Sequence, residues 1–96
     1  MNFDIKHSTE DQAFTVDING EEGELAYSMP RDGVMDLTHT YVSQNLRNKG
    51  LASKLVEKAI DYAKEKNWKI IATCPYVKTF FQRHTQYGDL LEEENY

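Results

Sequence analysis

The chain has 96 residues, of which 40% are hydrophobic and 28% are charged, so it fits one small folded domain and is too apolar for a disordered chain. Its single cysteine excludes an intrachain disulfide, and the lack of paired Cys or His ligands argues against a zinc site. A net charge of −5 argues against a nucleic-acid surface.

We expect one domain over residues 1–96, in which residues 89–96 form an acidic tail. The first residues do not have the pattern of a signal peptide, and no stretch is long and apolar enough to span a bilayer. We therefore expect a cytoplasmic protein, a monomer or weak dimer, that binds neither nucleic acid nor membrane.

Charge is distributed unevenly along the chain. Residues 1–46 carry nine acidic side chains against two basic ones, whereas residues 47–88 carry nine basic side chains against three acidic ones. The basic part could receive a polyanionic cofactor while the acidic part attracts a cationic substrate. Chance asymmetry between solvated faces is the alternative interpretation.

The first half of the chain predicts four strands, because apolar residues alternate there with a period of two. The expected strands are residues 2–7, 12–18, 24–29 and 34–42. Asn19-Gly20 favours a tight hairpin, and Pro30-Arg31-Asp32-Gly33 is a second turn signal. These strands would form an antiparallel meander. On the fourth strand, alternation places His39 on one face with Met35, Leu37 and Tyr41.

The second half changes period. Apolar residues at steps of three and four predict an amphipathic helix from Leu51, with Asn67 as its stop. Lys69–Cys74 reads as a short buried strand that Pro75 ends, and residues 77–84 as a second helix. A strand, a helix and a further strand in this order make a crossover, so the fourth and fifth strands should be parallel. The fold class is mixed α/β.

The junction between the fourth strand and the long helix carries the chemistry. A helix N-terminus presents unpaired backbone N–H groups and the positive end of a dipole, which together suit a phosphate. Gly50 and Ala52 leave room for close approach, and Arg47 and Lys49 add positive charge. From these residues alone, an ordinary glycine at a helix start is the simpler interpretation.

The spacing Arg47-x-x-Gly50-x-Ala52 resembles the pyrophosphate-binding motif of the GNAT acetyltransferase superfamily. Further segments across residues 12–91 resemble its compact GNAT-like subfamily of bacterial proteins of roughly one hundred residues. Those segments are His39-Thr40-x-Val42, Leu46-Arg47-x-x-Gly50-Leu51-Ala52-x-Lys54-Leu55-Val56, Cys74-Pro75-Tyr76-Val77 and Phe80-x-x-Arg83-His84.

The resemblance implies that strands four and five splay apart and that the pantetheine arm of acetyl-CoA or CoA runs between them. The cofactor-binding residues that it implies are Tyr41, Val42, Arg47, Asn48, Lys49, Gly50, Leu51, Ala52, Cys74, Pro75, Tyr76, Val77 and Phe80. This sequence departs from the wider superfamily in two ways. It has no long helix between its opening strands, and no carboxylate stands out as a general base on strand four or five.

The candidate catalytic residues are Cys74, His39 and Tyr76. Cys74 could accept an acetyl group or protonate the departing thiolate, although a buried free cysteine is also common in cores. His39 could deprotonate an amine, since the imidazole pKa suits that task, or could be a hydrogen-bonded core histidine. Tyr76 or Tyr41 could donate a proton, and Phe80 could be a core residue rather than a cofactor wall.

The function expected from the sequence is transfer of an acetyl group from acetyl-CoA to a primary amine of a small molecule or peptide, an acceptor that the acidic half suggests is cationic. A CoA-binding protein with little or no turnover is the alternative, and an acetyl–Cys74 relay is a third interpretation.

Overall fold

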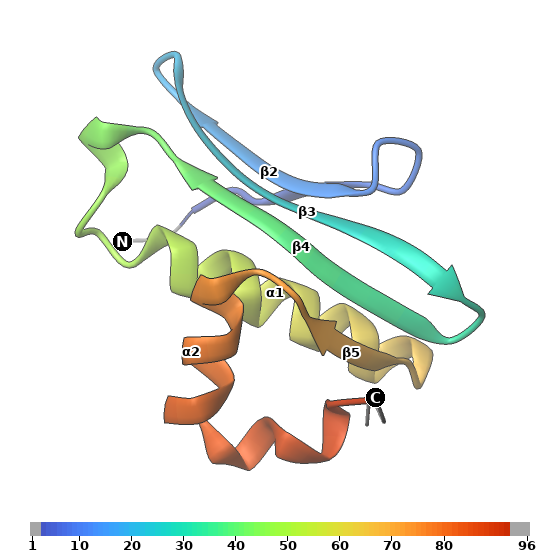
Figure 1. Ribbon diagram of the computed structural model, residues 1–96. Coiled ribbons are helices and arrows are strands. Elements are labelled where there is room, and N and C mark those ends of the chain that lie inside the picture. The colour runs from blue at the N-terminus through green and yellow to red at the C-terminus, as the bar shows by residue number, and fades with distance from the viewer. Residues whose placement is uncertain (1–2, 93–96) are drawn as a thin grey trace.

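The computed structural model describes residues 3–92 and contains one five-stranded sheet with strands in chain order (Figure 1). Its elements are β1 (Lys6–Ser8), β2 (Ala13–Ile18), β3 (Glu21–Arg31), β4 (Val34–Val42), the 3-10 helix η1 (Gln44–Leu46), α1 (Leu51–Lys66), β5 (Lys69–Ala72), α2 (Pro75–Arg83) and the 3-10 helix η2 (Thr85–Leu90). Strands β1 to β4 pair antiparallel and β4 pairs parallel with β5, which confirms the predicted mixed α/β fold.

Some boundaries differ from the sequence-based expectation. The strand β3 begins at Glu21 and continues through Pro30 to Arg31, where a turn was expected. Proline is tolerated there because the pairing of β3 with β4 is irregular between Ser28 and Arg31, so no ladder hydrogen bond is lost. The first strand is confined to residues 6–8, and position 2 of the predicted strand lies outside the described residues.

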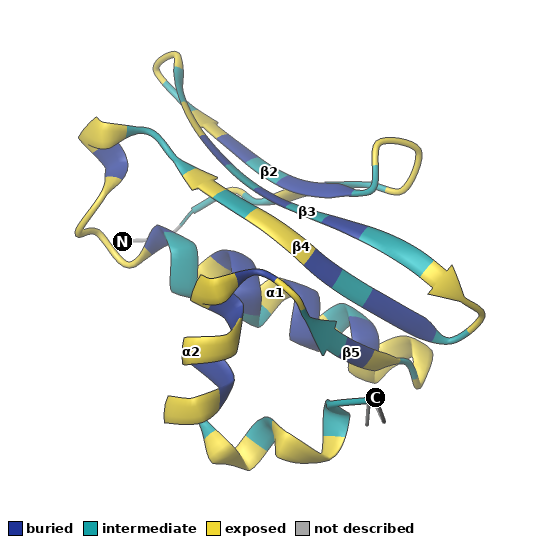
Figure 2. Cartoon of the chain, viewed as in Figure 1, coloured by how far each residue is buried: buried dark blue, intermediate teal, exposed yellow. Residues whose placement is uncertain are grey.

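The predicted apolar stripe of α1 covers one face of the sheet and forms the centre of the core. Its buried residues are Leu51, Leu55, Val56, Ala59, Ile60 and Ala63, and Figure 2 shows the buried side of the helix turned toward the strands. Full burial of one such leucine or isoleucine side chain is worth about 1.5–3 kcal/mol. The helix ends at Asn67, whose left-handed conformation turns the chain so that the N–H of Trp68 donates to the carbonyl of Ala63 at 2.8 Å, while the N–H of Asn67 donates to that of Lys64 at 3.2 Å.

The C-terminal segment packs beside β5. Leu91 forms a parallel bridge with Ile70, and the N–H of Glu92 donates to the Ile70 carbonyl at 2.8 Å. The first residues of the predicted acidic tail therefore lie against the sheet, and residues 93–96 lie outside the described part of the chain. Each helix within residues 3–92 is too short or too polar to cross a membrane.

Gly23 on β3 sets how closely α1 approaches the sheet. A Cβ at this position would lie 2.7 Å from Cδ2 of Leu51, closer than packed atoms come, and 3.1 Å from Cγ1 of Val16, which is also a tight contact. Leu51 is the first residue of α1 and is almost completely buried, so it has little room to move. The glycine therefore fixes the start of α1 against the strand.

We expect Gly23→Ala to lower the free energy of unfolding by about 1–3 kcal/mol, because the added methyl overpacks this contact. Gly88→Ala is the matched control, since a Cβ at Gly88 meets nothing within 4 Å. Chemical denaturation of both variants measures the difference. Equal stability of the two variants would show that Gly23 does not set the approach of α1.

Candidate functional site

The strands β4 and β5 separate halfway along β4. They pair from Val34–Lys69 to Leu37–Ala72, and then the N–H groups of Thr73 and Cys74 both donate to the carbonyl of Leu37, at 3.2 and 2.9 Å. Beyond that carbonyl β4 continues to Val42 while the chain after β5 turns into α2 (Figure 1). The predicted splay of the two strands is thus present, and it leaves the second half of β4 with one free edge.

Two backbone amides face this splay. The N–H of Ser43 donates to the Glu22 carbonyl at 2.8 Å, so it points toward β3. Because N–H directions alternate along a strand, those of Thr40 and Val42 point the other way, into the gap. The carbonyl of Val42 faces the same side and accepts a hydrogen bond from Nε of Arg47 at 3.0 Å.

The loop between β4 and α1 is tied to the hairpin between β2 and β3. The carboxylate of Glu21 accepts hydrogen bonds from the hydroxyl of Ser43 and from Nδ2 of Asn45, the latter at 2.8 Å. These two bonds, the Ser43 bond first, hold the pKa of Glu21 below its ordinary value, with burial acting weakly in the opposite direction. Leu46 anchors the same loop by burying its side chain in the core.

The start of α1 has the properties of an anion site. Gly50 caps the helix at φ +79° with no side-chain capping bond, and the first turn contains no acidic residue. The N–H of Lys54 is the first to bond within the helix, to the Gly50 carbonyl, so the amides of residues 51–53 have no helical acceptor. Arg47 and Lys49 are exposed beside them.

A cavity of about 280 Å³ lies at this helix start. Its lining residues are Val42, Leu46, Arg47, Asn48, Gly50, Leu51, Ala52, Ser53 and Tyr76. A Cβ at Gly50 would meet nothing within 4 Å, so the glycine is needed for its positive φ rather than for close packing within the chain. Asn48, at φ +65°, is a second left-handed residue in the same loop.

Cys74 is buried at the end of the splay, at the N-cap of α2. Its Sγ lies 3.3 Å from Oγ1 of Thr40 on β4. Burial raises the pKa of the Cys74 thiol, but hydrogen bonds from the Thr40 hydroxyl and from the backbone N–H groups of Val77, Tyr76 and Thr40 outweigh it, so the pKa lies below its ordinary value. The site therefore favours the thiolate more than water does.

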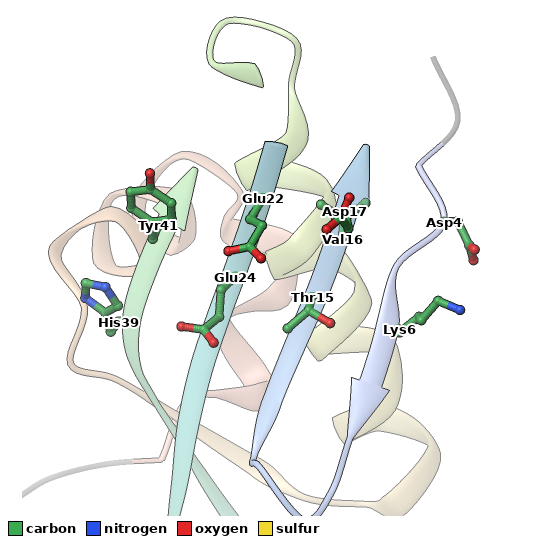
Figure 3. Close-up of a pocket in the computed structure, with 10 residues that line it drawn as sticks. Asp4, Lys6, Thr15, Val16, Asp17, Glu22, Glu24, His39 and Tyr41 are labelled. Carbon is green, nitrogen blue, oxygen red and sulfur yellow. The ribbon is translucent and has the colours of Figure 1, made fainter. Parts of the chain in front are cut away.

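His39 and Tyr41 lie on the opposite face of the sheet from the position predicted for them. His39 pairs with Ala26 and Leu37 pairs with Tyr27, so Thr38 is an extra residue that interrupts the alternation. This β-bulge turns Leu37 toward the core and His39 and Tyr41 toward the open face, where Figure 3 shows both side chains beside a hollow. The expectation that His39 shares a face with Met35 and Leu37 was wrong for this reason.

The remaining predicted residues fall into two groups. Tyr76 is partly exposed, and its hydroxyl lies 3.0 Å from the hydroxyl of Ser53 on α1, so it joins the two helix starts. Val77 and Phe80 face the core, and Phe80 stacks on His84 with ring centroids 4.1 Å apart. Pro75 is the first residue of α2, where its missing N–H costs nothing.

Sequence reasoning missed three residues that shape the site. Thr40 was part of a recognised motif, but its contact with Cys74 depends on the parallel pairing of segments 34 residues apart. Ser53 stands at an unassigned position of the helix motif, and Glu21 looks like an ordinary charged residue beside a turn. The run Ser43-Gln44-Asn45 after a strand was the available signal for a loop held by side-chain hydrogen bonds.

The chain is similar to proteins of a known family. The family model described as GCN5-related N-acetyl-transferase matches residues 13–90. Protein NATD1 of Homo sapiens is 29% identical over 82 residues, which cover 83% of this chain and 73% of the relative. Protein NATD1 of Danio rerio is 29% identical over 87 residues, which cover 86% of this chain and 79% of the relative.

The fold is also similar to a solved structure. A GCN5-like protein from Staphylococcus aureus, determined by NMR, superposes with a TM-score of 0.77 at 27% sequence identity. The match covers 99% of this chain and 93% of that protein. The similarity in fold therefore extends over nearly the whole length of both chains.

We expect Thr40→Val to raise the pKa of Cys74, because it removes a hydroxyl that stabilises the thiolate while preserving the size of the side chain. Ultraviolet absorbance of the thiolate during a pH titration measures this directly, since Cys74 is the only cysteine. The wild-type thiol should ionise at lower pH than a free thiol such as N-acetylcysteine, and the variant at higher pH than the wild type. Thr38→Val, on the exposed bulge, is the control and should titrate like the wild type.

Proposed function

This chain belongs to the GCN5-related N-acetyltransferase family, and we propose that it transfers an acetyl group from acetyl-CoA to a primary amine of a small molecule or peptide. The observation that carries the proposal is that the first amides of α1, those of residues 51–53, have no helical acceptor and lie beside the gap between β4 and β5. Family membership supports the reaction class, and this geometry supports the way in which the chain would hold acetyl-CoA.

The residues at the start of α1 fit a diphosphate. Three free amides, the positive end of a sixteen-residue helix and two exposed cations converge where the first turn carries no acid. The open space around Gly50 gives a ligand access to this backbone. The amides of residues 51–53, with Arg47 and Lys49, would therefore hold the diphosphate of CoA.

The free edge of β4 fits the pantetheine arm. Pantetheine contains amide groups that can pair with a strand, and the N–H of Val42 points into the gap that β5 leaves, next to the N–H of Thr40 that faces Cys74. When bound, acetyl-CoA supplies an acetyl group on a thioester. The N–H of Val42 is the donor on this edge that would polarise the thioester carbonyl, since the N–H of Thr40 already bonds to Cys74.

We assign the two proton transfers to His39, on β4, and to Cys74, which contacts Thr40 on the same strand. A ring nitrogen of His39 would accept the proton of the attacking amine, directly or through a water molecule. Sγ of Cys74 would donate a proton to the departing thiolate, because a thiol of lowered pKa gives its proton readily to a more basic sulfur. The hydroxyl of Tyr76, near the same helix start, is the alternative donor.

Turnover with acetyl-CoA and a panel of primary amines tests this function. Release of CoA thiol that depends on the acceptor, with an acetylated amine as product, is the expected result. Saturable binding of acetyl-CoA without acceptor-dependent release would instead identify a CoA-binding protein. Acetylation of the protein that disappears in Cys74→Ala would identify a relay through that thiol.

We expect Lys49→Glu to weaken CoA binding by about tenfold or more, because it places a negative charge beside the diphosphate. Lys58→Glu makes the same change of charge on an exposed position further along α1 and should leave the affinity nearly unchanged. Isothermal titration with CoA compares the two variants. Equal affinities would contradict the placement of the diphosphate at the start of α1.

A further inference from the structure

The open face of the sheet contains a second and larger hollow, of about 510 Å³, on the side opposite α1. Figure 3 shows its side chains coming from β1 to β4 and from the segment before β1. Its lining residues are Asp4, Lys6, Thr15, Val16, Asp17, Glu22, Gly23, Glu24, His39 and Tyr41. A concave site of this size on a rigid sheet is large enough for a small ligand.

Four carboxylates line this hollow, and three of them, on β2 and β3, are crowded together. Asp17 lies directly opposite Glu22 on the neighbouring strand, and Glu24 is two residues further along the same face of β3. Like charges directly across a sheet are destabilising. Asp17 accepts a hydrogen bond from the N–H of Gly20 in the hairpin, at 3.0 Å. Within residues 3–92 the carboxylates of Glu22 and Glu24 have no ion pair or side-chain hydrogen bond.

The hollow adjoins the proposed reaction site. Tyr41 lines the hollow and Val42 lines the cavity at the start of α1, so these successive residues of β4 face the two spaces. His39 lies beside Tyr41 on the hollow side. An amine held against His39 would therefore lie over β4, the strand whose free edge borders the gap between β4 and β5.

The charged side chains of the hollow differ from one end to the other, because they follow the order of the strands. Tyr41, Glu24, Thr15 and Lys6 lie in one row across β4, β3, β2 and β1. Neighbouring strands are about 4.8 Å apart, so Glu24 is one strand spacing from Tyr41 and Lys6 is about three. The negative charge of Glu24 thus lies close to His39 and Tyr41, whereas Lys6 and Asp4, of opposite charge, lie together at the far end.

We propose that this hollow is the acceptor site and that it selects short, linear amines with a second positive charge. The reacting amine would lie against His39 and Tyr41, and the second ammonium would lie between Glu24 and Glu22. The repulsion between Asp17 and Glu22 would be relieved by that ammonium. This inference rests on the proposed acetyl transfer.

Putrescine and butylamine provide the test, because they have the same carbon chain and differ only in the second ammonium. With saturating acetyl-CoA, thiol release should show a kcat/KM about five- to tenfold higher for putrescine, and the preference should shrink with added salt. The Glu22→Gln/Glu24→Gln variant should lose the preference. Glu65→Gln, an exposed position on α1, is the control and should keep it. A preference that survives in the double variant overturns the proposal.

A second pair of acceptors, both peptides, shows whether the second positive charge comes from a free diamine or from a basic peptide. A short peptide with two adjacent lysines is compared with one in which the second lysine is alanine. A charge preference confined to the peptide pair would identify a basic peptide as the substrate, and one confined to putrescine would identify a free diamine. Either result supports selection by the second ammonium, and no preference in both pairs overturns it.

Two measurements separate this inference from other failures. If no amine supports thiol release, acetyl transfer fails, and the hollow is then judged by amide chemical shifts on adding putrescine alone. Shifts gathered at Thr15, Glu24 and Tyr41 would support the binding site, and their absence would overturn it. The double variant should melt at or above the wild-type temperature, because it loses like-charge repulsion, whereas a lower melting temperature would show that the carboxylates serve folding and would contradict the proposal.

Discussion

The carbonyl of Leu37 is the point on which the architecture of the site depends. It is the last acceptor shared by β4 and the chain after β5, and two successive N–H groups, those of Thr73 and Cys74, converge on it. In a regular parallel ladder, one N–H of β5 would donate to the Leu37 carbonyl, and the next donor would pair with the next acceptor along β4. Because two N–H groups share one carbonyl, the ladder ends there, the edge of β4 is left free, and the chain turns into α2. The same turn brings the thiol of Cys74 against Thr40.

The bulge at Thr38 gives β4 a second role. Before the bulge, Leu37 packs in the core, and after it His39 and Tyr41 face the open side of the sheet. One strand therefore separates a basic cavity at the start of α1 from an acidic hollow on the other face. The uneven distribution of charge along the sequence becomes, in space, a difference between these two sides. The constraint at Gly23 holds the start of α1, and with it the basic cavity, close to the sheet.

Local patterns were sufficient for most of the fold. Alternating residues located β4, steps of three and four located α1, and Asn67 marked the helix end, because each depends on neighbours in the sequence. The helix motif at Arg47 to Ala52 likewise pointed to the anion site. Sequence reasoning did not find the bulge at Thr38, since one extra residue leaves no local signature and reverses every later side chain on the strand. The contact of Thr40 with Cys74 and the close approach of Gly23 to Leu51 were equally hidden, because both arise from packing between distant segments.

The central claim is that main-chain amides at the start of α1 hold a diphosphate while the free edge of β4 holds the rest of CoA. Amide chemical-shift mapping of the isotopically labelled protein with CoA and, separately, with pantetheine tests it most directly, because pantetheine lacks the diphosphate. The account predicts that CoA moves the amides of residues 50–53 together with those of Thr40 and Val42, and that pantetheine moves only the strand amides. Shifts from CoA that leave residues 50–53 unchanged would contradict the account.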